Sequence, residues 1–586
     1  MVRPLLGPLD QMKVSDYVVK FLRRKGVRHV FELSGGMITH LLDSLCLDGG
    51  IRVVSVHHEQ AAAFAADATG RMTGVPGVAM ATSGPGATNL LTGIGSCYFD
   101  SSPAVFITGQ VNRHEQKGDR RIRQLGFQET DIVSMALPIT KAAWRVEDPA
   151  QVPALLEQAF AIATHGRPGP VLVDIPMDIQ RAQIEDPEPA QPEPEPSARS
   201  VADCQPLRDA LLSARCPLVL AGGGLRAGRA IGEFRRFLDA TGIPAVNSLM
   251  AVDALPYGHP SRVGMIGTYG NRWANLALCR SDLLLVLGSR LDVRQTGART
   301  DAFKAGRAIF HVDCDEGETN NRVRGCEIII AELAAFLPQL TQTMGAACPD
   351  PGARWTTWRQ EIEQLRSAWP DTAELSGCAG INPNTLMHQV SRHSRHAAAF
   401  VVDVGQHQMW AAQSLEIGLS QRFLTSGGMG SMGFGLPAAI GVALAVTGKS
   451  VVLVAGDGGF QCNIQELQTV ARNRLPLKIL VLNNRCHGMV RQFQQSYCEG
   501  RYQSTYWGYS APDFAAVSSA YGLRAATLEE PDRVEDALQW LWAEPLEPQL
   551  LQVMIDPFCN VYPKVAFGRP ISEMEPQSRP VDIEST

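Results

Sequence analysis

Val451–Phe460, VVLVAGDGGF, is followed later in the chain by Asn483–Met489, NNRCHGM. An apolar run before GDG predicts a buried strand that ends at Asp457, and the carboxyl ends of such strands are where α/β folds bind ligands. A second apolar run, Leu477–Leu482, brings Asn484 to the same edge. A carboxylate, an amide oxygen, a backbone carbonyl and diphosphate oxygens together suit octahedral Mg²⁺. GDG or NN alone could be a plain turn, but their order and spacing predict a metal–diphosphate site.

Short β-branched runs alternate with amphipathic stretches along most of the chain. Runs of this kind, bounded by Gly, Asp or Asn and followed by helix-like patterns, are typical of parallel βα units. The sequence therefore predicts an α/β protein built from doubly wound parallel sheets. The runs that carry this prediction are Val78–Thr82, Ala104–Thr108, Pro217–Leu220, Leu283–Leu287, Ser450–Val454 and Lys478–Leu482.

Two joints divide the chain, because 586 residues exceed what one hydrophobic core supports. Glu185–Ala198, EDPEPAQPEPEPSA, is a Pro/Glu-rich spacer that we expect to run extended on the surface. Met344–Pro383 is polar and irregular. We therefore predict three domains, over residues 1–190, 191–375 and 376–586, and a mobile tail after Pro570, which is rich in Glu, Ser and Pro.

Composition and charge argue against several classes of protein. The net charge is −6, with acidic and basic residues mixed, so no basic stripe of a nucleic-acid binder is present; the cluster Arg120, Arg121 and Arg123 predicts a solvated loop. The 13 cysteines contain no CxxC pair, which argues against a zinc site or a disulfide framework and fits a reducing compartment. Met1–Leu22 has no signal-peptide pattern, and Gly433–Gly448 is too short and too punctuated to span a bilayer. We expect a cytoplasmic protein that binds neither nucleic acid nor membrane.

A second candidate site lies in Val54–Gly74, VSVHHEQAAAFAADATGRMTG. Glu59 follows a predicted strand, Val53–Val56, and opens an Ala-rich helix. The helix dipole favours Glu at such a position without any function. The neighbours are largely apolar, however, and an unpaired buried carboxylate among them would be costly. A cofactor nitrogen that shares the proton of Glu59 would remove this cost.

Longer motifs along nearly the whole chain resemble those of the acetohydroxyacid synthases, which are thiamine-diphosphate-dependent enzymes. The resemblance implies a pyrimidine-binding domain, a flavin-type central domain and a diphosphate-binding domain, in that order. The motifs are HEQAA (His58–Ala62), TSGPGATN (Thr82–Asn89), ITGQV (Ile107–Val111), FQET (Phe127–Thr130), GRPGPVLVDIP (Gly166–Pro176), VGQHQMWAAQ (Val404–Gln413) and GGMGSMGFGLPAAIG (Gly427–Gly441).

The resemblance implies thiamine diphosphate and Mg²⁺ as cofactors and assigns a role to each matching residue. Glu59 would exchange a proton with N1′ of the aminopyrimidine, the Gly430 carbonyl would accept from the 4′-amino group, and Met432 would hold the cofactor bent. Gln128 and Gly36 would line the substrate space. The metal ligands would be Asp457, Asn484 and the main-chain oxygen of Cys486. The other cofactor-binding positions would be Val404, Gly405, Gln406, His407, Gly458, Gly459, Gly488 and Met489.

The middle segment resembles the FAD-binding domain of the family through VLAGGGLRAG, NSLMA, GSRLDVRQTG and HVDCD. A GGG after a strand is weak support by itself, since it also makes a plain turn, and a flavin would have no redox step in carboligation. The implied FAD contacts are Arg167, Gly222, Gly223, Gly224, Leu249, Met250, Gly288, Arg290, Asp292, Arg294 and Asp313.

The implied activity is decarboxylation of pyruvate and transfer of the two-carbon fragment to a second pyruvate, as in branched-chain amino acid biosynthesis. Phe493, Met177, Asn112 and Val293 depart from the family pattern, and the loop between Asn112 and Phe127 is longer. Most of these positions border the acceptor side of the pocket in the family. A flavin-containing carboligase that adds an acetyl group to a larger ketone or a nucleotide-linked keto-sugar, a pyruvate oxidase and a non-catalytic subunit are the alternatives. We expect a homodimer or homotetramer; whether a regulatory small subunit binds stays open.

Overall fold

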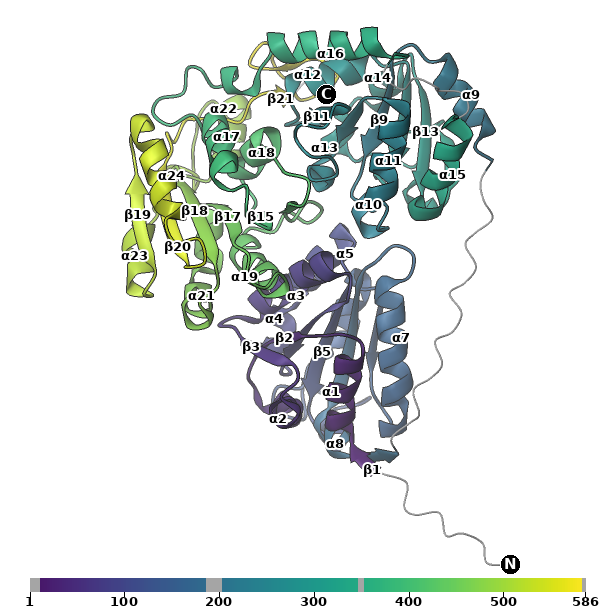
Figure 1. Ribbon diagram of the computed structural model, residues 1–586. Helices are drawn as coiled ribbons and strands as arrows, with labels where there is room; N and C mark the ends of the chain where they lie inside the picture. The colour runs from purple at the N-terminus through teal and green to yellow at the C-terminus, as the bar shows by residue number, and fades with distance from the viewer. Residues whose placement is uncertain (1–10, 186–202, 346–352, 582–586) are drawn as a thin grey trace, which may run out of the picture. The chain divides into compact units, whose positions relative to one another are not determined.

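The computed structural model describes residues 11–185, 203–345 and 353–581, which form two compact units (Figure 1). The first unit consists of Met1–Pro196, Gly428–Thr447 and Asn463–Leu475, and the second consists of Ser197–Gly427, Gly448–Cys462 and Pro476–Thr586. Apart from Glu185, the predicted Pro/Glu-rich spacer lies outside the described residues.

The first unit is built on a six-stranded parallel sheet in the order β3-β2-β4-β5-β7-β6. The strands are β2 (His29–Leu33), β3 (Arg52–Ser55), β4 (Gly77–Ala81), β5 (Ala104–Gln110), β6 (Ala142–Arg145) and β7 (Pro170–Pro176), and β1 (Gln11–Lys13) pairs with β8 (Gln183–Glu185) beside them. The helices are α1 (Val14–Arg24), α2 (Thr39–Asp48), α3 (Glu59–Thr73), α4 (Pro85–Asn89), α5 (Leu91–Asp100), α6 (Ile132–Ala136), α7 (Val152–Thr164), α8 (Met177–Arg181), α19 (Gly435–Ala445) and α21 (Leu467–Asn473).

Both faces of this sheet are buried. Val78 and Met80 of β4 belong to the core that contains α1 and α7, whereas the alternate residues Ala79 and Ala81 point to the opposite face and are equally buried. A strand covered on both faces reads as a continuous apolar run, which explains why these runs were recognisable in the sequence.

Small side chains let the helices on one side pack at very close range. A Cβ atom on Gly441 of α19 would lie 2.2 Å from the carbonyl oxygen of Ala65 on α3, and one on Gly93 of α5 would lie 2.2 Å from the Cβ of Ala63. These distances leave no room for a side chain, so packing alone demands the Ala-rich and Gly-rich character of the helices. The contact fixes α3, which begins at Glu59, against the helix that follows Gly430 and Met432.

The second unit contains two further parallel sheets of six strands each. The central one has the order β11-β10-β9-β12-β13-β14, with β9 (Pro217–Ala221), β10 (Ala245–Asn247), β11 (Arg262–Met265), β12 (Leu283–Leu287), β13 (Ala308–Asp313) and β14 (Glu327–Ile330). Its helices are α9 (Gln205–Ser213), α10 (Gly224–Ala227), α11 (Ile231–Thr241), α12 (Arg272–Arg280), α13 (Val293–Thr296), α14 (Thr300–Lys304), α15 (Leu333–Gly345) and α16 (Thr356–Ala368).

The last sheet has the order β16-β15-β17-β18-β20-β19, and β17 lies between β15 and β18. Its strands are β15 (Ala399–Val402), β16 (Arg422–Leu424), β17 (Val451–Gly456), β18 (Leu477–Asn483), β19 (Arg524–Leu528) and β20 (Gln549–Met554). The accompanying helices are α17 (Pro383–His393), α18 (Gln406–Ser414), α20 (Asp457–Cys462), α22 (Gly488–Tyr497), α23 (Phe514–Ala520) and α24 (Val534–Trp542). The predicted class, an α/β protein with three parallel sheets, is confirmed. Each sheet lies within one predicted domain, although the exact boundaries stay a prediction.

Two expectations about irregular segments are wrong. The polar stretch Met344–Pro383 contains α16, because Trp358, Ile362 and Leu365 recur at helical spacing and are buried in the central core. The tail after Pro570 is held in place up to Ser578: β22 (Met574–Glu575) pairs with β21 (Lys564–Val565), and Met574 lies in the same core. The Lys564–Glu575 ion pair, 3.0 Å between Nζ and Oε1 and buried on both sides, adds to this attachment.

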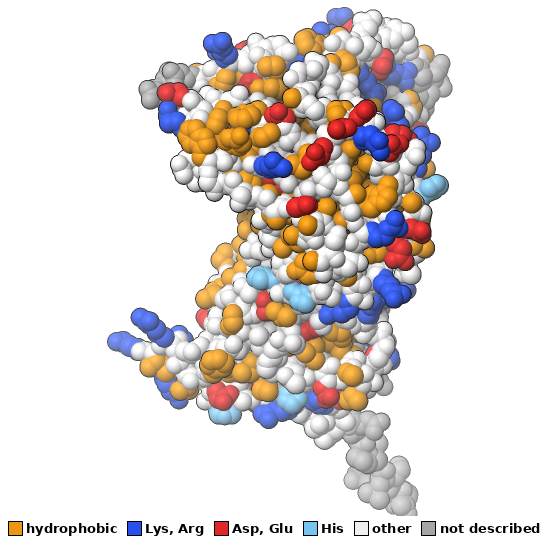
Figure 2. Space-filling model, turned by 90° about the vertical axis from the view of Figure 1, so that its left-hand side faces the viewer, with side chains coloured by type: hydrophobic (Ala, Val, Ile, Leu, Met, Phe, Trp, Pro, Cys, Tyr) orange, Lys and Arg blue, Asp and Glu red, His pale blue; other side chains and the backbone are white. Residues whose placement is uncertain are grey.

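The surface is chemically mixed. On the face shown in Figure 2, Lys and Arg side chains are interspersed with Asp and Glu, and neither sign of charge covers the face alone. Within the part of the chain that the structure describes, no helix is both long and apolar enough to cross a membrane.

Candidate active site

The predicted metal site lies where β17 and β18 end. β17 ends at Gly456, and Asp457 begins α20 with only 3% of its surface exposed. Its Oδ1 accepts from the Gly458 N–H at 2.9 Å, whereas Oδ2 has no hydrogen-bond partner among the described residues. Burial raises the pKa of Asp457 to about 6, although the N–H of Gly458 and the Tyr509 hydroxyl oppose the rise. A buried carboxylate with an unused oxygen is what a cation ligand requires.

Asn484 lies beside Asp457 and is held from two sides. Its Oδ1 accepts from the Cys486 N–H at 3.3 Å, and its Nδ2 donates to Gln406 Oε1 at 3.0 Å. The Cys486 N–H also lies close enough to Asp457 to lower the pKa of that carboxyl. Asp457, Asn484 and Cys486 therefore lie together where β17 and β18 end, and their role as metal ligands stays a prediction.

Glycines keep the floor of this site open. A Cβ on Gly488 would lie 1.9 Å from Gln406 Oε1, and one on Gly456 would lie 2.7 Å from His407 Nδ1. His407 is buried, and its Nε2 has no partner among the described residues. Burial lowers the pKa of His407 to about 3, although a hydrogen bond with the Asp403 backbone opposes the fall, so the ring is neutral and has a single N–H. An unpartnered nitrogen and an unpartnered carboxylate oxygen beside backbone without side chains fit a diphosphate held through Mg²⁺.

The remaining diphosphate positions surround this floor. Val404 and Gly405 precede α18, Gly458 and Gly459 lie in the first turn of α20, and Met489 lies in the first turn of α22. All of these residues belong to the second unit.

The residues predicted around the pyrimidine lie in the first unit. Glu59 is the first residue of α3 and is 6% exposed. Its Oε2 accepts from Asn89 Nδ2 at 2.9 Å, and its Oε1 lies 3.1 Å from the point where a Cβ on Gly86 would be. The glycine therefore leaves space beside the carboxylate that any other residue would fill. One oxygen of the Glu59 carboxylate thus accepts a hydrogen bond from a side chain, and the other has space beside it. A carboxylate that gives and takes a proton needs this arrangement.

Gln128 and Gly36 are positioned by the same loops. Gln128 has a left-handed backbone, φ +65°, and its Cβ lies 2.9 Å from where a Cβ on Gly84 would be. Gly36 opens the short turn η1 (Gly36–Ile38), and the next N–H, that of Met37, donates to Thr82 Oγ1 at 3.2 Å. Gln128 therefore lies beside Gly84, and the residue after Gly36 is hydrogen-bonded to Thr82, both in the motif Thr82–Asn89 that also supplies the partner of Glu59.

The loop that contains Gly430 and Met432 is anchored on both sides. Gly428 N–H donates to Asp100 Oδ1 at 2.6 Å, and Asp100 Oδ2 accepts from Arg71 Nη2 at 2.9 Å. On the other side, Asn463 Nδ2 donates to the Gly433 carbonyl at 2.8 Å. Between these anchors Gly430 has φ +68° and Met432 is 39% exposed, which leaves the methionine side chain available for contact with a ligand.

The predicted FAD positions in the second unit gather at the carboxyl edge of the central sheet. Gly222, Gly223 and Gly224 follow β9, and Leu249 and Met250 lie in η5 (Leu249–Ala251) after β10. Gly288, Arg290, Asp292 and Arg294 follow β12, and Asp313 ends β13. Arg167 is in the first unit, where its Nε donates to Ser101 Oγ at 2.8 Å.

Packing already explains part of the glycine pattern at this edge. A Cβ on Gly222 would lie 2.1 Å from the carbonyl oxygen of Gly288, and one on Gly224 would lie 2.7 Å from the Gly288 Cα. The two strand-end turns touch backbone to backbone. Gly222 and Gly224 are therefore required by the fold whether or not a flavin binds.

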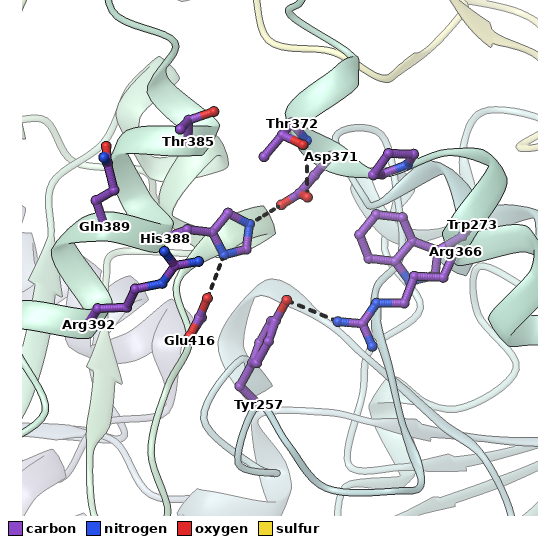
Figure 3. Close-up of a pocket in the computed structure, with 11 residues that line it drawn as sticks. Tyr257, Trp273, Arg366, Asp371, Thr372, Thr385, His388, Gln389, Arg392 and Glu416 are labelled. Atoms are coloured by element: carbon purple, nitrogen blue, oxygen red, sulfur yellow. Dashed lines mark hydrogen bonds and ion pairs between the residues drawn. The ribbon is translucent and has the colours of Figure 1, made fainter. Parts of the chain in front are cut away.

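Another hollow in the second unit lies away from the predicted site residues (Figure 3). His388 of α17 points between two carboxylates: Nε2 is 3.0 Å from Asp371 Oδ2, and Nδ1 is 2.9 Å from Glu416 Oε1. Because both ring nitrogens face acceptors, the ring is best paired when doubly protonated. Burial works against that charge, but the hydrogen bonds and charges of Asp371 and Glu416 outweigh it and raise the pKa of His388.

Sequence reasoning missed several residues that support the site. Asn89 and Asp100 contact the site through side chains whose partners are remote in the sequence. Tyr509 has no motif of its own; its ring packs against that of His487 with centroids 4.4 Å apart and the planes tilted by 60°. Asn89 could have been found, because it ends the quoted motif Thr82–Asn89.

Comparison with known proteins agrees with this geometry. Family models of the thiamine pyrophosphate enzymes match three stretches of the chain: the N-terminal thiamine pyrophosphate-binding domain over residues 12–135, the central domain over 204–340 and the C-terminal thiamine pyrophosphate-binding domain over 403–553. The fold and the site thus define a thiamine pyrophosphate enzyme of three domains.

Relatives define the family more closely. The chain is 39% identical to the acetolactate synthase isozyme 2 large subunit of Escherichia coli (strain K12), over 96% of this chain and 99% of that one. It is 35% identical to the acetolactate synthase large subunit of Pyropia yezoensis, over 97% of both chains, and 34% identical to that of Lactococcus lactis, over 96% of this chain and 95% of that one. The chain belongs to the family of acetolactate synthase large subunits.

Proposed function

We propose that this protein decarboxylates pyruvate and joins the two-carbon fragment to a second pyruvate, forming acetolactate. The observation that carries the proposal is the unpartnered oxygen of buried Asp457 beside Asn484 at the carboxyl ends of β17 and β18. The family names and the three matched domains support the same reaction class.

Each residue has a defined task in this proposal. Thiamine diphosphate, when bound, supplies the electron sink for cleavage of the bond to the carboxylate. Asp457, Asn484 and the Cys486 carbonyl would hold Mg²⁺, while Gln406 and His407 would bind the diphosphate. Glu59 would give and take a proton at a carboxylate screened from water, and Asn89 keeps that carboxylate oriented. Met432 would support the cofactor, and Gln128 would line the substrate space.

FAD is part of the proposal as a structural cofactor. The strand ends of the central sheet present Arg290, Asp292 and Asp313 at one edge, where a doubly wound fold binds a dinucleotide. Asp292 caps α13 through the Arg294 N–H, which orders the turn that would meet the flavin.

The acceptor side supports a second candidate, addition of the acetyl group to a larger or neutral ketone. Phe493 is 49% exposed on α22, and its ring packs against that of Tyr497 at a tilt of 45°, with centroids 4.5 Å apart. It stands where the family usually has Trp, and Met177 stands where the family usually has Lys. Loss of that cation weakens attraction for a carboxylate-bearing acceptor, and a smaller ring leaves more space.

We further propose a cytoplasmic homodimer or homotetramer, because the two halves of each cofactor site come from different subunits in this family. The size of the protein in solution, measured with and without cofactors, tests this point. A cofactor-loaded monomer with full activity would contradict it.

Product analysis decides between the candidate functions. Protein loaded with thiamine diphosphate, Mg²⁺ and FAD is supplied with pyruvate alone, and then with pyruvate plus 2-ketobutyrate or a neutral diketone. We expect acetolactate from pyruvate alone. Carboligation products that form only with the added ketone would favour the second candidate. Hydrogen peroxide together with acetate, or another product at the oxidation level of acetate, would indicate an oxidase. No consumption of pyruvate would contradict both carboligase functions.

A further inference from the structure

The hollow around His388 lies between elements that belong to two sheets of the second unit (Figure 3). Its volume is about 380 Å³, which is in the range of pockets that hold small molecules. Tyr257, Trp273 of α12 and Arg366 of α16 line it on the side of the central sheet, and α17 and Glu416 line it on the side of the last sheet. None of the residues that line the hollow is a proposed cofactor contact, so the proposed function does not explain it.

Two arginines lie over the ring of Tyr257: the Cζ atoms of Arg262 and Arg366 are 4.9 and 5.4 Å from its centroid. Arg366 Nη2 donates to the Tyr257 hydroxyl at 3.0 Å, which leaves its other N–H groups available. Arg262 is 9% exposed, and its guanidinium has no hydrogen bond or ion pair within the described part of the chain. Burial and the charge of Arg366 lower the pKa of Arg262 to about 10, although the tyrosine and Asp371 oppose the fall. A cation buried to this degree without an acidic partner is costly, which favours a ligand of opposite charge.

The carboxylates that line the hollow do not neutralise these arginines. Asp371 and Glu416 are both directed at His388, with oxygens 3.0 and 2.9 Å from its two ring nitrogens. Arg392 of α17 is exposed, lines the hollow as well, and has no hydrogen bond or ion pair among the described residues. Three guanidinium groups at or beside the hollow thus lack an acidic partner, and positive charge is in excess there.

We propose that this hollow binds a small phosphate-bearing molecule. The planar guanidinium of Arg366 lines the hollow and suits bidentate contacts with phosphate oxygens. Together with the adjacent Arg262 it matches a phosphate monoester, which carries about two negative charges at neutral pH, better than a single carboxylate. The hydroxyl groups of Thr372 and Thr385 and the amide of Gln389 also line the hollow and can form hydrogen bonds with hydroxyl groups of the same molecule.

Binding at this place would join α16 to α17. Ile362 and Leu365 of α16 are buried in the core of the central sheet, whereas Leu386 and Val390 of α17 are buried in the core of the last sheet. A ligand held by Arg366 of α16 and by polar side chains of α17 contacts both helices, so its binding should stabilise the folded protein. This inference does not rest on the proposed function, because no cofactor takes part in it.

Calorimetric titration tests the binding and the class of ligand. The full chain is supplied with thiamine diphosphate, Mg²⁺ and FAD, so that the proposed cofactor sites are filled, and is titrated with inorganic phosphate, sn-glycerol 3-phosphate, malonate or glycerol. We expect saturable binding of phosphate and of glycerol phosphate, a Tm that rises with their concentration, and no binding of glycerol. Absence of saturable binding of both phosphates would overturn the proposal. Tighter binding of malonate than of both phosphates would overturn the assigned class of ligand.

Variants that each remove one positive charge locate the site. Arg366→Gln should weaken the binding of glycerol phosphate about ten- to a hundredfold, the loss of one hydrogen bond to a charged group. Arg392→Gln should weaken it less, because this exposed side chain attracts the anion through screened charge. Arg280→Gln removes the same charge from an exposed residue of α12 outside the hollow and should leave the affinity unchanged. Equal affinity in Arg366→Gln and wild type would contradict the proposal.

Chemical modification of the wild type gives an independent measurement. Phenylglyoxal, which modifies arginine, is applied with and without glycerol phosphate, and the modified peptides are identified by mass spectrometry. The ligand should protect Arg366 and leave the modification of Arg280 unchanged. Equal modification of Arg366 in both samples would overturn the proposal, even if Arg366→Gln fails to fold.

Discussion

At the scale of single residues, Glu59 is the most direct test of the chemistry. Glu59→Gln keeps the shape of the side chain and its hydrogen bond to Asn89 but cannot carry a proton. Turnover of pyruvate should fall by about 10²–10⁴-fold, while the affinity for thiamine diphosphate stays within a few-fold. Steady-state kinetics and a cofactor titration measure the two effects, with Glu157→Gln on the surface of α7 as the control. Turnover close to wild type would remove Glu59 from the mechanism.

Asp457 tests the metal at the same scale. Asp457→Ala removes the carboxylate whose Oδ2 has no partner within the described chain, so the dependence of cofactor binding on Mg²⁺ should be lost. EDTA should release thiamine diphosphate from wild type but change little in the variant. Mg²⁺ titration in the presence of the cofactor measures both, and Asp536→Asn, an exposed carboxylate on α24, is the matched control. An unchanged Mg²⁺ response would show that the metal lies elsewhere.

At the scale of elements, the contact between α3 and α19 depends on the absence of a side chain. Gly441→Ala adds a Cβ atom at a point where the Ala65 carbonyl leaves no space. The variant should therefore lower the free energy of unfolding by about 1–3 kcal/mol. Gly232→Ala on α11 is the opposite case: its Cβ meets only the flexible end of Arg236, so the variant should gain about 0.5–1 kcal/mol of helix propensity. Urea unfolding of the two variants measures the difference. Equal stabilities would show that α3 and α19 are not tightly packed.

His388 of α17 lies between the carboxylates of Asp371 and Glu416, and this arrangement predicts that the stability of the protein depends on pH. Because the pKa of His388 is raised above its ordinary value of 6.5, its contribution is fully present below that value and is lost as the pH rises through the raised pKa. His388→Gln should therefore lower Tm more at pH 6 than at pH 9. His393→Gln, whose partner Glu535 is exposed, should change Tm little at either pH. A Tm difference for His388→Gln that does not depend on pH would contradict the assignment.

At the scale of the whole molecule, the proposed sites predict a protein that binds thiamine diphosphate, Mg²⁺ and FAD and in which FAD does no redox work. The purified protein should be yellow, and the flavin absorbance should persist while pyruvate is consumed. Arg290→Ala should lose FAD and still bind thiamine diphosphate, because Arg290 follows β12 of the central sheet, whereas the proposed metal and diphosphate residues follow strands of the last sheet. Bleaching of the flavin in step with pyruvate consumption would point to an oxidase, and full activity in a colourless preparation would refute a requirement for FAD.

Much of the architecture was predictable because buried parallel strands have a strong local signal. The predicted run Leu283–Leu287 coincides with β12, and Pro217–Leu220 and Lys478–Leu482 differ from β9 and β18 by one residue at an end or at both ends. Strand ends carry Gly, Asp or Asn for local reasons of turn geometry, so the candidate ligands Asp457 and Asn484 could be located as well. The resemblance then assigned their roles.

The class of fold, the strands and the motif residues at their ends could therefore be predicted from the amino-acid sequence, because they depend on local apolar runs and backbone geometry. Their surroundings depend on contacts between segments that are distant in the chain. The Asn89 partner of Glu59 and the Asp100 anchor of the Gly428 loop join residues far apart in the chain, and no local pattern encodes such a pairing. The burial of α16 and of the C-terminal tail belongs here too, since a polar-looking segment becomes ordered when a distant core covers its few apolar residues.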